Sequence, residues 1–204
     1  MGNGVVKSFV LVAALSMIGS SAFAEDAAMA KGMELVAKKS WAEAIKSFDE
    51  SIKADAKNSE AYLERALCNF HLGNYAKVVD DCKEVTGHDS AHAVSKRQAY
   101  MMMSGALNAQ NKFEDAINSC NKALELSPKN SLVYDDRGFA YLRLNKLEEA
   151  LKDSNEAIKY DPKHAGSYEL RAAVYKALSL RDSAKYKELM DGKNPNEKPW
   201  EKKK

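Results

Sequence analysis

The chain has 204 residues, of which 45% are hydrophobic and 29% are charged, so it is long enough for one large or two small domains with a buried core. With only 10 Gly and 4 Pro, its composition excludes collagen-like and low-complexity chains. The 31 Lys and Arg balance 29 Asp and Glu to a net charge of +2, which excludes the broad basic field of a dedicated nucleic-acid binder.

The segment from Met1 to Ala24 has the pattern of a secretory signal peptide. Lys7 precedes an apolar run from Phe9 to Ile18, and the chain then reaches Ala22-Phe23-Ala24. This run is shorter than the roughly 20 residues that span a bilayer, and small residues follow it. We therefore expect no membrane span, cleavage between Ala24 and Glu25, and a periplasmic or secreted mature chain. An uncleaved leader on a cytosolic protein is the alternative.

A repeat with a period of about 34 residues occupies most of the remaining chain. Two series of equivalent residues show it: Tyr62, Tyr100, Tyr134 and Tyr168, and Ala44, Val78, Ala116, Ala150 and Ala184. Both series contain one longer interval, so four extra residues lie between Val78 and Tyr100. The stretch from Gly87 to Ser90 is the natural place for an extra turn.

Each period predicts two amphipathic helices. Apolar residues recur three and four apart from Leu142 to Ile158, with a short break at Asn145-Lys146. Pro128 and Pro162 mark places where a helix must stop, because proline lacks the amide donor. The expected architecture is therefore a series of helical hairpins, with no strands.

These residues resemble the tetratricopeptide repeat family. The copy at residues 131–164 carries the family pattern in six positions: Tyr134, Gly138, Tyr141, Ala150, Ala157 and Pro162. The resemblance implies an all-α solenoid of about five hairpins in a right-handed superhelix, at residues 25–58, 59–96, 97–130, 131–164 and 165–190. It also implies a concave groove, lined by the first helix of each repeat, that holds a peptide or protein.

The last residues, 191–204, contain Gly192, Pro195, Pro199 and three terminal lysines, and we expect them to be a disordered tail. Without the leader and this tail, the repeat body has 25 bases and 26 acids. A body with this balance offers no basic face for nucleic acid.

The sequence offers only weak candidates for catalysis. Cys68 and His71 share a helical face and could form an activated thiol, although a buried cysteine is more often a packing residue. His88, Asp89 and His92 suggest a metal site, but they straddle an expected helix start, and structural zinc normally takes four ligands. No phosphate loop or nucleophile elbow is present. We expect neither an enzyme nor a cofactor.

Three cysteines would meet an oxidising environment after export. Cys68 and Cys82 fall on the two helices of one expected hairpin, so a disulfide between them is possible if their backbones approach within roughly 7 Å. The other interpretation, which we favour, is that the cysteines are small buried hydrophobes.

The expected groove combines an apolar and an acidic part. Its apolar positions are Met29, Met33, Leu63, Leu67, Phe70, Met101 and Met102. Its acidic positions, Asp135, Asp136 and Glu169, surround Phe139. The positions with which related clamps grip an acidic C-terminal peptide carry no cation here. We therefore expect a partner segment with apolar and basic residues, unless several methionines turn into the core instead.

An exported repeat protein without catalytic motifs is best interpreted as a protein-interaction module or adaptor of the cell envelope. Two alternatives stay open at this point. One is a structural subunit that self-assembles into homo-oligomers through the ends of its stack. The other is a thiol- or metal-dependent enzyme.

Overall fold

The computed structural model describes residues 27–89 and 91–190, which divide between two compact units, residues 1–128 and 129–204. The described residues form helices and turns without a strand, so the predicted all-α repeat fold is confirmed. The expected leader with its cleavage site, and the expected disordered tail, lie outside the described residues.

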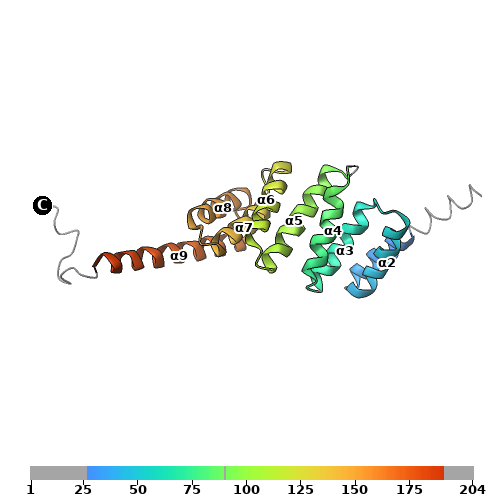
Figure 1. Cartoon of the computed structure of the whole chain (residues 1–204), viewed down its shortest axis with the longest axis horizontal. Helices are drawn as coiled ribbons and strands as arrows, with labels where there is room; N and C mark the ends of the chain where they lie inside the picture. The colour runs from blue at the N-terminus through green and yellow to red at the C-terminus, as the bar shows by residue number, and fades with distance from the viewer. Residues whose placement is uncertain (1–26, 90, 191–204) are drawn as a thin grey trace, which may run out of the picture. The chain divides into compact units, whose positions relative to one another are not determined.

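The first unit is a stack of antiparallel helices in chain order (Figure 1). It begins with a helix at residues 27–37. Five further helices follow: α2 Trp41–Ala54, α3 Ser59–His71, α4 Tyr75–Gly87, α5 Ala93–Ala109 and α6 Phe113–Leu126. Each helix from α2 onward packs on the next, and α3 also packs on α5, as expected for successive hairpins.

The second unit contains one hairpin and one long helix. The hairpin consists of α7 Ser131–Arg143 and α8 Leu147–Tyr160, and α9 Ala165–Met190 packs on both of them. The far end of α9 continues beyond the hairpin (Figure 1).

The four residues that interrupt the repeat period lie in a helix and not in a loop. Helix α5 has 17 residues, whereas α3 and α7, its equivalents, have 13. Tyr100 lies seven residues after the start of α5, but Tyr62 and Tyr134 lie three residues after the starts of their helices. The extra residues therefore add one turn to the beginning of α5. The position expected from the sequence, the stretch from Gly87 to Ser90, is slightly too early.

The hairpin turns depend on one residue in the left-handed backbone region. Lys39, Gly73, Asn111 and Asn145 have φ values of 58°, 74°, 59° and 58°. They follow the repeat period, and the next equivalent position is Ser179. Ser179 is helical, so α9 is a single helix of 26 residues. The fifth hairpin expected at residues 165–190 is therefore not formed.

Lys39 is the least suited of these turn residues, because glycine has no Cβ and asparagine tolerates positive φ, whereas lysine disfavours it. We expect Lys39→Gly to raise the free energy of unfolding by about 1 kcal/mol. The matched control is Lys46→Gly, at an exposed position inside α2, which should lower it by about 1 kcal/mol. Urea unfolding followed by circular dichroism measures both values; a loss of stability in both variants would contradict the assignment.

The core of each hairpin uses a small residue where two helices approach closely. These positions are fully buried: Ala44, Val78, Ala116 and Ala150. Phe48, also fully buried, fills the first hairpin, and a Cβ at Gly32 would lie only 2.5 Å from its ring. The period that defines the repeats is thus the period of the core contacts.

Candidate functional surface

The apolar groove positions all lie in the first unit, on the residue 27–37 helix, α3 and α5. Met33 and Phe70 are exposed, at 43% and 36% of their surface. Four positions are half-buried: Met29, Leu67, Met101 and Met102. Leu63 is only 6% exposed and belongs to the core, so it offers almost no surface to a partner.

Part of the methionine set also serves the core. Met29 packs against the buried cluster of Ala44, Phe48 and Cys68. The alternative in which some methionines turn into the core therefore holds for Met29, whereas the side chain of Met33 is exposed.

Phe70 is held in place with part of its ring uncovered. Its ring meets Tyr75 edge to face, with the centroids 5.4 Å apart. A Cβ at Gly105 would lie 3.5 Å from the Phe70 ring, an ordinary van der Waals contact, so Gly105 of α5 packs close beside the ring. A fixed and partly exposed aromatic ring is a typical anchor position in a recognition surface.

The acidic positions lie in the second unit, on α7 and α9. Phe139 is 39% exposed, with the Arg143 guanidinium 5.7 Å from its ring centroid. Asp136 is half-buried and Glu169 is exposed. Each of the two groups of groove residues therefore belongs to a single unit.

Asp135 does more than contribute charge, because it connects α7 to the start of α9. The Ser167 hydroxyl donates a hydrogen bond of 2.6 Å to Asp135 Oδ2, and His164 Nε2 lies 3.4 Å from the same oxygen. Burial raises the pKa of the Asp135 carboxyl, although the Ser167 hydrogen bond and His164 act in the opposite direction. Asp136 and Glu169 are therefore better probes of surface charge than Asp135.

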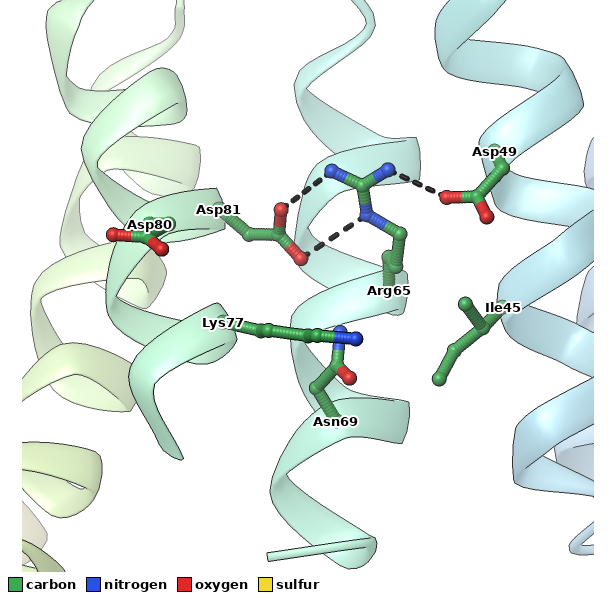
Figure 2. Close-up of a pocket in the computed structure, with 7 residues that line it drawn as sticks. All are labelled: Ile45, Asp49, Arg65, Asn69, Lys77, Asp80 and Asp81. Atoms are coloured by element: carbon green, nitrogen blue, oxygen red, sulfur yellow. Dashed lines mark hydrogen bonds and ion pairs between the residues drawn. The ribbon is translucent and has the colours of Figure 1, made fainter. Parts of the chain in front are cut away.

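A recurring arginine network forms a second polar feature, which the sequence analysis did not identify. Arg65 on α3 donates to Asp81 Oδ1 and Oδ2 of α4 at 2.6 and 3.2 Å, and to Asp49 Oδ1 of α2 at 2.6 Å (Figure 2). These groups line a cleft with Ile45, Asn69, Lys77 and Asp80. The three helices are therefore joined by one guanidinium.

The second unit repeats this arrangement. Arg137 donates to both carboxylate oxygens of Asp153 at 2.7 and 2.8 Å, and Arg171 donates to Asn155 at 3.0 Å. In each case the arginine lies 5.4 Å from the ring of the tyrosine three residues earlier. A signal was present in the sequence, because a Tyr-x-x-Arg pattern recurs with the repeat period at Tyr62, Tyr134 and Tyr168.

Burial decides the electrostatics of this network. Desolvation raises the pKa of Asp81, although the adjacent Arg65 acts to lower it. Desolvation lowers the pKa of Arg65, but hydrogen bonds to Asp81 and Asp49 outweigh it, so the pKa of Arg65 is raised. The carboxylates of Asp49 and Asp81 already accept hydrogen bonds from the guanidinium, so this network is a structural connection between helices.

The thiols lack the features of a nucleophile. Cys68, Cys82 and Cys120 are buried, and no disulfide joins Cys68 to Cys82 in the described chain. Burial raises the pKa of Cys68 to about 11 and that of Cys82 to about 12, the opposite of thiolate activation. His71 stacks on Trp41 with ring centroids 4.1 Å apart.

The proposed metal residues do not form a cluster. His88 lies edge-on to the Tyr62 ring, and His92 precedes the first residue of α5. Across residues 27–89 and 91–190, no group of three or more His, Cys, Asp or Glu side chains is placed to hold a metal ion.

Three family models match the chain. The tetratricopeptide repeat models match residues 29–84 and 133–164, and a model described as TPR repeat matches residues 106–145. The chain is 29% identical over 104 residues to a DnaJ homolog subfamily C member 7 homolog of Dictyostelium discoideum, and 27% identical over 101 residues to the TPR repeat-containing protein YsoA of Bacillus subtilis. These alignments cover 49% and 50% of this chain but only 19% and 29% of the relatives.

Solved structures show the same fold. A crystal structure of MamA protein matches with a TM-score of 0.70 at 20% identity, covering 82% of this chain and 91% of MamA. The first TPR of Spaghetti (RPAP3), solved with the HSP90 peptide SRMEEVD, matches with a TM-score of 0.55 at 25% identity, covering 61% of this chain and 96% of that one. No described helix combines the length and hydropathy needed to cross a bilayer.

Proposed function

Because the chain is built from tetratricopeptide repeats, we propose that it is an exported protein-interaction module that binds segments carrying apolar and basic side chains. Export rests on the leader pattern ending at Ala24, and the intact mass of the protein secreted by its host tests that part. We propose neither a catalytic activity nor a nucleic-acid partner.

The carboxylates and rings of this surface carry the proposal. In the second unit, the half-buried Asp136 and the 39% exposed Phe139 lie on α7, and the exposed Glu169 lies on α9. In the first unit, Met33 and Phe70 are exposed apolar anchors. An apolar anchor with carboxylates suits a segment that alternates apolar and basic side chains.

An acidic ligand such as the one in the RPAP3 structure fits this chain less well. A carboxylate is gripped by lysine, arginine and asparagine donors. At the corresponding positions this chain has Glu64, Gln98 and Asp136, together with apolar residues. We therefore expect acidic C-terminal peptides to be poor ligands.

A pair of matched peptides tests this preference. The probes are a 12-residue peptide of alternating Leu and Lys, its counterpart with Glu in place of Lys, and the peptide SRMEEVD. We expect the Lys peptide alone to bind, with an affinity that falls as salt increases. The combined Asp136→Asn and Glu169→Gln variant should weaken binding about ten-fold, since both carboxylate charges of this surface are removed.

The control carries the same charge change elsewhere in the second unit. Glu148 and Glu149 are exposed on α8, and their replacement by Gln should leave peptide affinity within two-fold. Equal weakening by both double variants would show that net charge, and not this surface, attracts the peptide. Preferential binding of SRMEEVD would overturn the proposal.

A further inference from the structure

One face of α9 is more exposed than the equivalent face of the earlier helices, which is buried or half-buried. Ala66, Ser104 and Gly138 occupy one repeat position and are buried, but Ala172 at the same position is exposed. Tyr62 is 8% exposed and its equivalent Tyr168 is 42% exposed. Leu107 is 5% exposed and its equivalent Tyr175 is 53% exposed. Within the described chain α9 contacts only α7 and α8, so this face has lost its cover.

The missing cover is the second helix of the last repeat. Because Ser179 continues the helix, the second half of α9 does not fold back on the first. That half is also unsuited to the role, since Arg181 and Lys185 occupy the positions of the buried Leu147 and the half-buried Leu151. The exposed face must therefore remain in water or be covered by another molecule.

Seven exposed residues form a continuous line along the whole helix, which we call the α9 stripe. Its members alternate in spacing between four and three residues: Tyr168, Ala172, Tyr175, Ser179, Asp182, Tyr186 and Leu189. This is the heptad spacing with which two helices pack along one seam. Small or polar residues in the middle allow close approach and fix the register, and large residues anchor both ends.

We propose that the α9 stripe is a dimer interface, and that its occupant is the α9 stripe of a second copy in antiparallel orientation. The stripe itself lies outside the peptide-binding surface proposed above, although Glu169 on its flank belongs to both. Such a dimer would place two copies of the interaction surface in one assembly, which favours partners with repeated segments.

The exposed area suits a weak dimer. The four large side chains of the stripe are each between 42% and 54% exposed. At about 200 Å² for a fully exposed side chain of this size, they leave roughly 400 Å² per copy uncovered. Two copies would bury about 800 Å² through these anchors alone, which is about two thirds of the roughly 1,200 Å² of small specific interfaces.

Charge favours the antiparallel orientation. Glu169 and Lys187 are separated by about five helical turns, and so lie on the same flank of the stripe near opposite ends. An antiparallel copy places each Glu169 beside the Lys187 of the other copy. In a parallel pair each flank faces the opposite flank of its partner, so these two opposite charges do not meet. On the other flank, Lys185 donates to Glu188 and Arg171 donates to Asn155 within the same chain.

Sedimentation velocity over a range of concentrations tests the dimer, using the chain as its host processes it. We expect a reversible dimer with a dissociation constant on the order of 10 µM. Combined Tyr175→Glu and Tyr186→Glu should weaken dimerisation at least ten-fold. The matched control is Leu180→Glu, because Leu180 is 62% exposed but lies on a different face of α9, and it should leave the dimer unchanged.

Crosslinking tests the orientation. An antiparallel seam places the two copies of position 179 within several ångströms of each other and the two copies of position 189 about 30 Å apart. A short thiol crosslinker should therefore join chains carrying Ser179→Cys but not chains carrying Leu189→Cys. Crosslinking of both variants would overturn the antiparallel arrangement.

Two results would overturn the interface itself. One is a monomer at every concentration, including in a chain that ends at Met190. The other is dimerisation only after that truncation, which would show that residues 191–204 cover the stripe within one chain. Sedimentation measures the dimer without any peptide, so failure here is separable from failure of the proposed function.

Discussion

Replacing Asp153 with Ala is expected to lower the free energy of unfolding by about 3–5 kcal/mol. The Asp153 side chain is only 2% exposed, and both of its oxygens accept hydrogen bonds from Arg137. Its removal leaves a largely buried guanidinium with two unsatisfied donors, which costs more than the pair itself contributes. Urea unfolding monitored by circular dichroism measures the loss.

The control removes both partners together. Arg137→Met combined with Asp153→Leu should bring stability back to within about 1 kcal/mol of the natural chain, since no charge then remains unpaired. The third repeat has an uncharged pair in place of this ion pair, because Met103 and Ser119 are buried at the positions equivalent to Arg137 and Asp153. If Asp153→Ala alone costs less than about 1 kcal/mol, the pair is not the connection that we describe.

Most of the fold follows from sequence spacing, because the contacts that build it are local. Ala44 and Ala150 are fully buried at the positions that the period marked, and the helices end where proline or a turn residue requires it. Whether the last repeat forms a hairpin or one long helix depends on a single turn residue. Ser179 lacks the left-handed preference of Asn145, and the apolar spacing around it is equally compatible with one long helix.

The candidate surface was harder to predict, because a residue's face on a helix does not determine what the next repeat covers. Leu63 and Met33 both fit the expected groove by position, but neighbouring helices bury only Leu63. Asp135 fits as well, yet Ser167, 32 residues further along the chain, donates a hydrogen bond to it. Such contacts between repeats depend on packing and leave no local pattern.

Phe48→Ala should also be strongly destabilising, by about 3–5 kcal/mol, because it leaves a cavity in the core of the first hairpin. The ring is fully buried beside Ala44 and Cys68, and a Cβ at Gly32 would lie 2.5 Å from it. Phe139→Ala is the matched control, since that ring is 39% exposed, and it should cost less than about 1 kcal/mol.

A double-mutant cycle tests whether Gly32 and Phe48 form one packing unit. Gly32→Ala alone should cost about 1–3 kcal/mol, since its new methyl group meets a ring that the surrounding core holds in place. In a Phe48→Leu background the same substitution should cost less, because the smaller side chain leaves room for the methyl group. Equal costs in the two backgrounds would show that the glycine is required for a reason other than close contact with the ring.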